Sequence, residues 1–392
     1  MITAVLSNEK HPEYGAVTVP FPIHNYTDIY EKLEAIGVGH IAIRDCFVKE
    51  LDSDIAVLKR LRETEINVDE LDYLAKRLES FDRHELAQFQ GAAVSRDLSN
   101  MTDLINLTFC CQGVTVVQNF TDLEAVGRTH YMNLHGGLTV DELQGIDFHK
   151  TALALLLNED GLITPYGVVY ENGMELEQVY DGLYFPDYRY SGDTLLVVAV
   201  TDWSLPEDSK DITWLYLPAE DCQIERALLR SGADRMGEMR LRFMESEFPE
   251  EVDAALDMEN DDLHSLNRLC EAISVLDPLD REKLNAVIQF TKPCNAEQIT
   301  HLAQQVDLFD YAPNISTPEE YGRHMIQKSG HFQYDGELDE FYDFKKYGEQ
   351  RIADEYGQFV PSGYISYHGF SSIEEVLSGN QAERMDMTMG GM

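Results

Sequence analysis

Apolar residues recur at helical spacing in several stretches of the chain. Between positions 68 and 81 they fall on one stripe, which predicts an amphipathic helix packed on a core. The residues of this stripe are Leu71, Leu74, Leu78 and Phe81. Asp82 and Glu85 have the spacing of a capping box, so another helix is expected to begin after Asp82. A third helix is predicted over residues 28–36, because Gly37 follows its apolar positions as a stop.

Shorter apolar runs between turn residues predict strands. In the first part of the chain they cover residues 2–7, 16–21 and 40–48. The chain is therefore β-rich at its start and helical afterwards, and a short helix, a turn and a strand follow over residues 147–169. This order predicts a fold of the α+β class.

The same pattern occurs a second time. Residues 2–170, moved forward by 195 places, align with residues 197–365, and after one inserted residue the offset is 196. Identical aligned residues include Ala4 and Ala199, Gly37 and Gly232, Asn119 and Asn314, Gly127 and Gly322, and Asp147 and Asp343. A nearly constant offset over such a length predicts tandem duplication of a whole folded unit, since the short repeats of a solenoid cannot stand alone. We refer to residues 2–170 as copy 1 and to residues 197–365 as copy 2.

We predict that each copy is an elongated unit of three parts, with a β-containing first domain, a helical middle domain and a small α/β third domain. The predicted boundaries are 1–53, 54–136 and 137–170 in copy 1, and 197–248, 249–332 and 333–370 in copy 2. Residues 171–196 are expected to form an ordered, hairpin-like connector, because they are too rich in tyrosine for a flexible linker. Residues 371–392 are predicted to be an acidic, flexible tail.

The chain is strongly acidic, since 71 acidic and 30 basic side chains give a net charge of −41. Residues 2–170 carry 26 acids and 13 bases (net −13), and residues 197–367 carry 35 acids and 15 bases (net −20). A surface of this kind repels nucleic acid and attracts basic surfaces. A protein that is acidic only for solubility, or for life in high salt, has the same composition.

The sequence contains no recognised catalytic or cofactor-binding motif. Glycine-rich phosphate loops, the HExxH zinc motif and the GxSxG nucleophile motif are all missing. The six cysteines show no CxxC pair and no zinc spacing, and we expect them to be reduced thiols. His130 with His135, and the acidic stretch 257–262, are the weak candidates for a metal site. We therefore predict no enzyme activity, no cofactor and no metal.

The sequence also indicates where the protein works. Its longest apolar stretches are too short to span a bilayer. Residues 1–10 lack the basic start and apolar centre of a signal peptide. We therefore expect a cytoplasmic protein with no membrane partner.

Three stretches have the residues of a known protein family. They are Val68-Asp69-Glu70-Leu71-Asp72-Tyr73-Leu74-Ala75 with Phe81-Asp82, then Asn119-Phe120-Thr121-Asp122-Leu123-Glu124, and finally Phe341-Tyr342-Asp343-Phe344 with Gly363-Tyr364-Ile365. On these residues the chain resembles the ArdA family of antirestriction proteins, which are encoded by mobile genetic elements such as conjugative transposons. Family members have the same order of three domains. One copy has about the length of a whole member, so the resemblance covers both copies.

The resemblance implies DNA mimicry. Family members occupy the DNA-binding groove of type I restriction-modification enzymes, so the methyltransferase core of such an enzyme is the expected partner, and nucleic acid is not. Duplex DNA carries one charge per ~1.7 Å of axis, so a net charge of −41 matches roughly 70 Å of duplex. Because relatives act as symmetric dimers, the chain is expected to be a covalent pseudo-dimer, with further dimerisation left open.

The acidic side chains predicted to form the DNA-mimic surface lie mainly in the helical and third parts of the two copies. They are Asp69, Glu70, Asp72, Glu79, Asp82, Glu85, Glu247, Glu250, Glu251, Asp253, Asp257, Glu259, Asp261, Asp262, Asp280, Glu282, Glu337, Asp339, Glu340 and Asp343. Two other functions stay open. One is an acidic regulatory binder of another basic DNA-binding protein of a mobile element. The other is a hydrolase that uses a pair of carboxylates, which spacing alone does not exclude in so acidic a chain.

Overall fold

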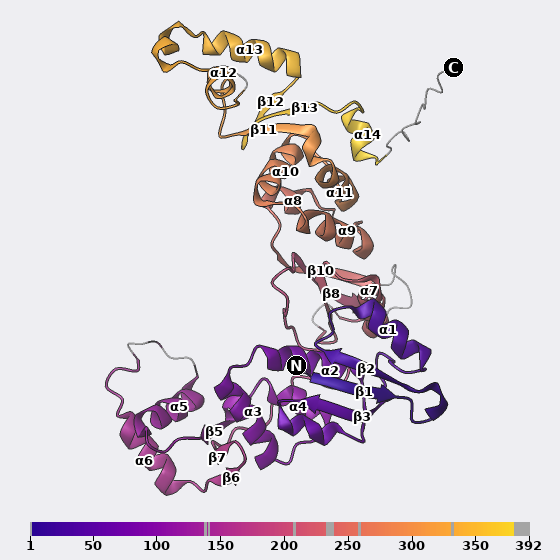
Figure 1. Ribbon diagram of the computed structural model, residues 1–392, viewed down its shortest axis with the longest axis vertical. Helices are drawn as coiled ribbons and strands as arrows, with labels where there is room; N and C mark the ends of the chain where they lie inside the picture. The colour runs from indigo at the N-terminus through magenta and orange to yellow at the C-terminus, as the bar shows by residue number, and fades with distance from the viewer. Residues whose placement is uncertain are drawn as a thin grey trace. The chain divides into compact units, whose positions relative to one another are not determined.

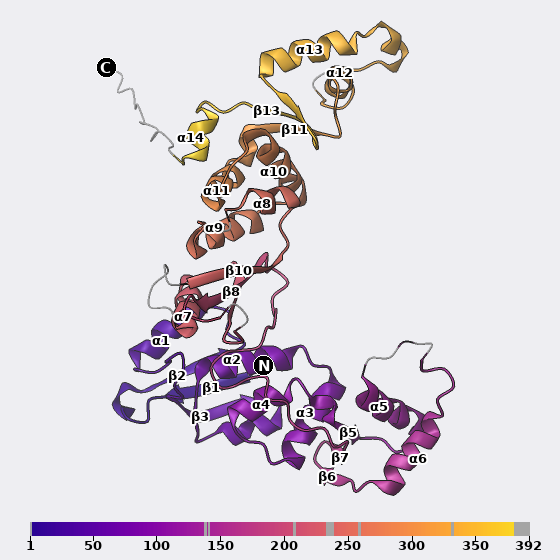
Figure 2. The same ribbon diagram turned by 180° about the vertical axis from the view of Figure 1, so that it is seen from behind.

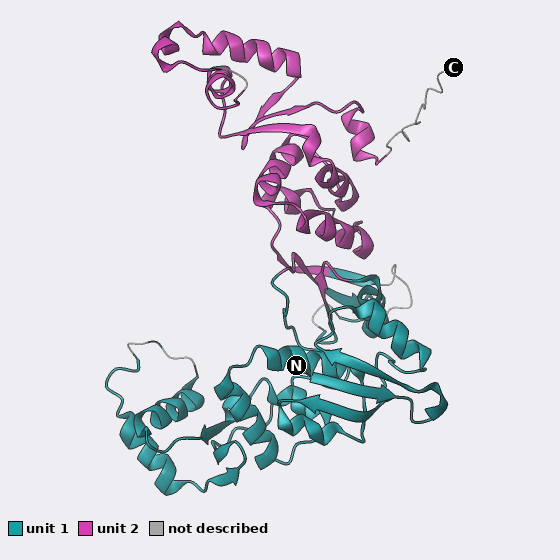
Figure 3. Ribbon diagram, in the orientation of Figure 1, with its two compact units in different colours: residues 1–192, 199–214, 220–241 teal, residues 193–198, 215–219, 242–392 magenta. Residues whose placement is uncertain are grey.

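The computed structural model describes residues 2–136, 139, 142–206, 209–232, 239–257, 260–330 and 333–379. It combines helices with several small sheets (Figure 1), which confirms the predicted α+β class. The chain divides into two compact units (Figure 3). Unit 1 comprises residues 1–192, 199–214 and 220–241, and unit 2 comprises residues 193–198, 215–219 and 242–392.

Unit 1 begins with a four-stranded sheet in the order β2-β1-β3-β4. Its strands are β1 (Ile2–Ser7), β2 (Ala16–Phe21), β3 (Cys46–Ser53) and β4 (Glu65–Ile66). The predictions for residues 2–7 and 16–21 are confirmed, but the strand expected from residue 40 begins only at Cys46. The reason is local: the Asp45 carboxylate accepts hydrogen bonds from the backbone N–H groups of Gly39 and His40 and holds these residues in a loop.

Four helices pack on this sheet and share one hydrophobic core with it. They are α1 (Tyr26–Ala35), α2 (Val68–Glu79), α3 (Arg83–Ser95) and α4 (Met101–Leu107). The apolar stripe of α2 lies in this core as predicted, with Leu71 and Leu74 fully buried. The expected capping box is present, because Asp82 accepts from the backbone N–H of Glu85 while the Glu85 carboxylate accepts from the backbone N–H of Asp82.

The rest of copy 1 forms a second, smaller layer of unit 1. A three-stranded sheet in the order β5-β7-β6 consists of β5 (Val114–Val117), β6 (Leu162–Thr164) and β7 (Gly167–Glu171). Helices α5 (Leu123–His135) and α6 (Phe148–Asn158) pack against each other beside it (Figure 1, Figure 2). Gly127 of α5 makes the close approach of the two helices possible, because a Cβ there would lie 1.7 Å from the carbonyl oxygen of Phe148.

Copy 2 starts with a third sheet, in the order β10-β8-β9. Its strands are β8 (Leu196–Asp202), β9 (Thr213–Leu217) and β10 (Met239–Ser246), and helix α7 (Asp221–Ser231) follows β9. Residues 199–214 and 220–241 of copy 2 belong to unit 1. The compact units therefore do not coincide with the two predicted copies.

Unit 2 continues with helices and a small sheet. The helices are α8 (Glu250–Ala255), α9 (Leu263–Ser274), α10 (Pro278–Thr291), α11 (Ala296–Gln304), α12 (Pro318–Gln327), α13 (Phe344–Glu355) and α14 (Ile373–Leu377). The sheet has the order β11-β13-β12, with β11 (Phe309–Pro313), β12 (Gln358–Val360) and β13 (Gly363–Tyr367).

The order of elements in copy 2 follows that in copy 1. The segments from β5 to β7 and from β11 to β13 match most closely, since each has a sheet whose last strand lies in the middle and a pair of helices in close contact. Both segments begin before the predicted third domains, in the part predicted as helical. A Cβ on Gly322 of α12 would lie 1.9 Å from the carbonyl oxygen of Phe344, as one on the aligned Gly127 would from that of Phe148. These correspondences agree with a tandem duplication, which stays a prediction.

The hairpin predicted for the connector is wrong, and residues 373–377 of the predicted flexible tail form a helix. Residues 172–195, all of them described, form neither helix nor strand, so the connector is not a hairpin. It is held instead by side chains of copy 1: the Asn106 carboxamide accepts from the backbone N–H groups of Val179 and Tyr180 and donates to the carbonyl of Tyr180. The predicted tail begins with α14, whose Val376 is buried, and residues 380–392 lie outside the described residues.

The helix contact at the two aligned glycines gives a test of the fold. We expect Gly127→Ala and Gly322→Ala each to lower the free energy of unfolding by about 2–4 kcal/mol, because the added methyl group overlaps a backbone carbonyl that cannot move without separating the helices. Urea unfolding followed by circular dichroism measures the loss. Gly192→Ala is the control, since a Cβ there meets nothing within 4 Å. An unchanged stability in either variant would contradict the close packing.

Candidate acidic binding surface

Most of the predicted surface carboxylates are exposed. Those whose residues are exposed are Glu79, Asp82, Glu85, Glu247, Glu250, Asp253, Asp262, Glu282, Glu337, Glu340 and Asp343. Glu251, Asp257, Asp261, Asp280 and Asp339 are partly buried, and Glu259 lies outside the described residues. The exposed group is distributed over both units.

The clearest concentration lies where β10 leads into α8. Glu247, Glu250 and Asp253 are exposed there. Glu250 and Asp253 lie in the first turn of α8, where the partial positive charge at the amino end of the helix stabilises carboxylates. Glu250 and Asp253 are three residues apart, which places side chains about 5–6 Å from each other on one face. Asp253 is also fixed in place, since it accepts a hydrogen bond of 2.8 Å from the Ser246 hydroxyl.

Several exposed carboxylates also cap helices. Asp82, Asp262 and Asp343 accept hydrogen bonds from backbone N–H groups at the starts of α3, α9 and α13. These bonds orient the carboxylates and lower the pKa of Asp82 below its usual value, with the backbone N–H of Glu85 as the main cause. The three residues are exposed, so these carboxylates are held by the backbone while they remain accessible to solvent.

Two partly buried acids, Asp261 and Asp339, form hydrogen bonds that hold neighbouring segments of the fold together. Burial raises the pKa of Asp261, whose carboxylate accepts from the backbone N–H groups of Asp257 and Ala296 and so joins the start of α11 to the preceding loop. Asp339 accepts from Tyr334 at 2.6 Å and from Arg323 at 3.2 Å, and its pKa is lowered mainly by the tyrosine hydroxyl. Both carboxylates are engaged by the fold, which gives no support to a catalytic pair at either position.

The basic side chains are arranged differently, because several of them point into the fold. Arg226 and Arg230 of α7 are 16% and 10% exposed, and Arg96, Lys76 and Lys283 are no more than about a fifth exposed. The cations are thus partly withdrawn from solvent while many carboxylates face it. This arrangement makes the solvent-facing surface more uniformly negative than random placement of the same charges would.

Three predicted surface residues are corrected by the structure. Asp69, Glu70 and Asp72 of α2 are 8%, 2% and 5% exposed, so they cannot contribute to an acidic surface. They are buried because each has a cationic partner and further hydrogen bonds, which compensate for the loss of water.

Asp69 is the centre of this buried group. Its carboxylate pairs with Arg226 at 2.7 Å and with Arg230, and it accepts a hydrogen bond from the Tyr30 hydroxyl. Burial alone would raise the pKa of Asp69, but Arg230 and Arg226 lower it below the usual value. Both arginines also donate to backbone carbonyls, those of Gly39 and Ile41, so the guanidinium groups are held on copy 1 by several bonds each.

Glu70 and Asp72 anchor the segments around α2. Glu70 forms a two-pronged ion pair with Arg44, at 2.9 and 2.7 Å, and accepts from the Tyr180 hydroxyl of the connector at 3.2 Å. Asp72 accepts from the backbone N–H of Ile23 at 2.7 Å and from the Tyr26 hydroxyl at 2.8 Å, and Lys76 lies 2.9 Å away. The three carboxylates of α2 therefore hold α7, the connector and the start of α1.

Helices α1 and α7, which align in the repeat, contact each other directly (Figure 1, Figure 2). Glu220 accepts from the backbone N–H groups of Tyr26 and Thr27 at 2.8 Å each and from the Thr27 hydroxyl at 2.6 Å. The Thr27 hydroxyl also lies 3.6 Å from the Cys222 sulfur. These two residues are 195 positions apart, so each meets its own aligned counterpart, as happens next to a two-fold axis.

Sequence reasoning missed Glu220, Arg226 and Arg230 as the residues of this contact. A usable signal was present, because Arg226 and Arg230 stand one helical turn apart in a chain that is poor in bases. Two cations on one helix face in so acidic a protein are expected to have carboxylate partners.

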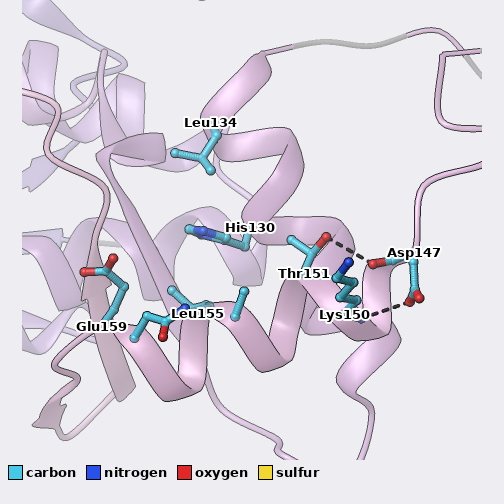
Figure 4. Close-up of a pocket in the computed structure, with 9 residues that line it drawn as sticks. His130, Leu134, Asp147, Lys150, Thr151, Leu155 and Glu159 are labelled. Carbon is cyan, nitrogen blue, oxygen red and sulfur yellow. Dashed lines mark hydrogen bonds between the residues drawn. The ribbon is translucent and has the colours of Figure 1, made fainter.

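A hollow of about 560 Å³ lies between α5 and α6 (Figure 4). Its lining includes His130, Leu134, Lys150, Leu155 and Glu159. His130 is fixed by a 2.9 Å hydrogen bond between its Nδ1 and the Thr115 hydroxyl, and burial lowers its pKa. Among the described residues, no group of three histidine, cysteine or acidic side chains is arranged to hold a metal ion.

Comparison with known proteins adds no assignment. No protein-family model matches the chain, and no curated protein matches it either. Of the helices that the structure describes, none is long and apolar enough to cross a membrane.

The buried ion pairs of Asp69 give a second test. We expect Asp69→Asn to lower the free energy of unfolding of unit 1 by about 3 kcal/mol at pH 7, because it leaves two buried arginines without their anion. The control is Asp28→Asn, which makes the same change in net charge at an exposed pair with Lys32 and is expected to cost less than about 1 kcal/mol.

The pH dependence of this difference follows from the direction of the pKa shift. Because the folded state lowers the pKa of Asp69, its contribution is fully present above the ordinary aspartate pKa of about 3.9 and is lost as the pH falls through the folded value. The stability gap between the wild-type protein and Asp69→Asn should therefore be constant from pH 7 to about 5 and shrink below about 4. Thermal unfolding at each pH measures it, and a gap that widens on acidification would contradict the ion pairing.

Proposed function

We propose that this chain is an antirestriction protein, which mimics duplex DNA with its exposed carboxylates and blocks the DNA-binding groove of a type I restriction-modification enzyme. It acts in the cytoplasm by binding and without turnover or cofactor. The observation that carries the proposal is the placement of charge: acids face solvent over both units, several of them held by helix caps, while some of the bases, such as Arg226 and Arg230, are largely withdrawn from solvent.

The physical basis is substitution of carboxylates for phosphates. A groove that binds DNA presents lysines and arginines at the spacing of the phosphate backbone, and their contacts supply much of the affinity. Exposed carboxylates held on a helix, such as those of Glu250 and Asp253 on α8, are the groups that we expect to occupy these places. Fixed side chains lose less conformational entropy on binding than free ones, which favours tight association. A protein surface also offers no base to methylate and no phosphodiester bond to cut.

The buried contact between α1 and α7 supports the second part of the proposal, that two ArdA-like copies are tied into one pseudo-dimer. Aligned helices meet there, and Asp69 of copy 1 is neutralised by Arg226 and Arg230 of copy 2. One chain with two similar copies could then bind both halves of a target enzyme that has two-fold symmetry. The duplicated order of elements is the further support.

The direct test is a methylation and cleavage assay with a purified type I enzyme. We expect the protein at a few-fold excess to block both reactions at about 50 mM salt, and the inhibition constant to rise by at least about tenfold at 200 mM, since the contacts are ionic. No inhibition at low salt would contradict the proposed function. Binding to another basic protein in its place would favour the regulatory alternative.

The role of the acidic surface can be separated from net charge. We expect Glu247→Gln, Glu250→Gln and Asp253→Asn together to weaken inhibition by about tenfold, because they remove three exposed carboxylates beside each other. The matched control is Glu9→Gln, Glu31→Gln and Glu34→Gln, which makes the same change of charge at exposed positions outside the predicted surface. An equal loss in both triple variants would show that overall charge, and not this surface, determines binding.

A further inference from the structure

The segments that follow β7 and β13 take corresponding paths, each within its own unit. In unit 1, the backbone N–H of Asn172 donates to the carbonyl of Gly113 at 3.1 Å. In unit 2, the backbone N–H of His368 donates to the carbonyl of Leu308 at 3.0 Å. The two donors are 196 positions apart and the two acceptors 195, which are the offsets of the repeat. We call these two segments the clasps, residues 172–182 in copy 1 and residues 368–379 in copy 2.

The two clasps are also anchored at aligned positions. Tyr180 and the aligned Val376 are both buried. Asn106 of α4 donates from its Nδ2 to the carbonyl of Tyr180 at 2.9 Å. The aligned His301 of α11 donates from its Nδ1 to the carbonyl of Leu377 at 3.0 Å. Both nitrogens are one bond beyond Cγ, so the two side chains present the donor at the same place.

The clasp of copy 1 depends on the helical domain for its backbone hydrogen bonds. The Asn106 oxygen accepts from the backbone N–H groups of Val179 and Tyr180 at 2.8 and 2.7 Å. The Tyr180 hydroxyl donates to Glu70 at 3.2 Å, and its ring stacks on Phe185 with 5.0 Å between centroids. If this clasp left α4, backbone N–H groups would lose their acceptor, which is costly for buried groups. We therefore expect it to stay in place.

The clasp of copy 2 satisfies the same backbone groups by itself. Histidine has a carbon atom, Cδ2, where asparagine has its oxygen, so His301 offers no acceptor there. The aligned N–H groups of Glu375 and Val376 donate instead to the hydroxyl and the carbonyl of Ser372, and the segment forms α14. Among the described residues, one hydrogen bond joins α14 to α11, and it is the bond from His301 to Leu377.

We propose that the clasp of copy 2 opens and closes on α11, with His301 as its latch, while the clasp of copy 1 stays closed. Helix α14 lies beside α11 (Figure 1, Figure 2). Opening releases the bond of His301 and the buried Val376, but the backbone bonds of α14 are its own. The proposal goes beyond the function proposed above, since it concerns a motion within unit 2. It gives copy 2 a two-state element, which a partner biases if it binds one state better.

Hydrogen exchange of the full chain, followed by mass spectrometry of its peptides, tests the motion without any enzyme. We expect the amides of residues 375–379 to exchange by local opening, faster than those of β13 but slower than an unprotected peptide. Gly379→Ala should speed this exchange by at least about tenfold. The added Cβ would lie 2.5 Å from Cε1 of His301, so the latch breaks whether the imidazole or α14 moves.

The matched control is Gly330→Ala. Gly330 has a φ of +75°, close to the +69° of Gly379, but a Cβ there meets nothing within 4 Å. The control therefore adds the same backbone strain without a collision, and it should leave the exchange of residues 375–379 unchanged. Equal effects of the two alanine variants would contradict the latch.

Substitution of the latch itself separates the two clasps. His301→Asn should keep the exchange rate within about twofold of the wild-type rate, because the asparagine donor takes the same place. His301→Leu cannot donate and should raise the rate by at least about fivefold, with an unchanged thermal transition. Asn106→Leu should instead lower the thermal transition, since it leaves the N–H groups of Val179 and Tyr180 unpaired.

Three results would overturn the inference and leave the proposed function untouched. In the first, the amides of residues 375–379 exchange only together with those of β13, so the clasp does not open by itself. In the second, they exchange at the unprotected rate in the wild-type chain, so there is no closed state. In the third, His301→Asn and His301→Leu have the same effect, so the donor of His301 is not the latch.

Discussion

The arrangement of unit 1 depends on one buried carboxylate. Asp69 lies in α2 of copy 1, and the arginines that neutralise it come from α7, 157 and 161 residues later in the chain. A carboxylate this deeply buried is stable as an anion only with its cations in place, and the arginines in turn need the anion. Residues 220–241 therefore join unit 1 although the repeat assigns them to the other copy. The ion pair decides where the compact unit ends.

The same constraint shapes the outside of the molecule. A cation that neutralises a buried carboxylate and is itself largely buried, as Lys76 is beside Asp72, is one fewer cation among the exposed acids. Asp82, Asp262 and Asp343 are satisfied in a different way, by backbone N–H groups at helix starts. For Asp82 these hydrogen bonds lower the pKa of the carboxyl group. Internal pairing withdraws some cations from the surface and helix capping orients some of its carboxylates, which is the arrangement that the proposed mimicry of DNA would use.

Local patterns in the sequence predicted local structure well. The stripe of α2 and the capping box at Asp82 depend on residues within a few positions of each other, so periodicity and spacing were sufficient. The same helix also shows that local patterns do not predict burial caused by distant parts of the chain. In the sequence, Asp69, Glu70 and Asp72 have the pattern of a solvated polar face. The face is buried because of partners far along the chain: Arg226 pairs with Asp69, and Tyr180 donates to Glu70, each from more than a hundred residues away. The prediction of a hairpin in the connector was wrong for a related reason. Hydrogen bonds to the Asn106 side chain of α4, and not strand pairing, hold this segment.

The two copies differ in a way that a covalent link would permit. Asp72 and the aligned Asn267 make the same kind of contact, since each accepts a hydrogen bond from the backbone N–H of a residue that follows a proline, Ile23 or Ala219. Asp69, by contrast, aligns with His264, and Arg226 aligns with Glu31. The ion pair can therefore form in one direction only. In a dimer of identical chains every contact off the axis occurs twice, so neither side can change alone. If the chain arose by duplication, joining the copies removed that restriction, and copy 1 could specialise as the acceptor of arginines while copy 2 became their donor.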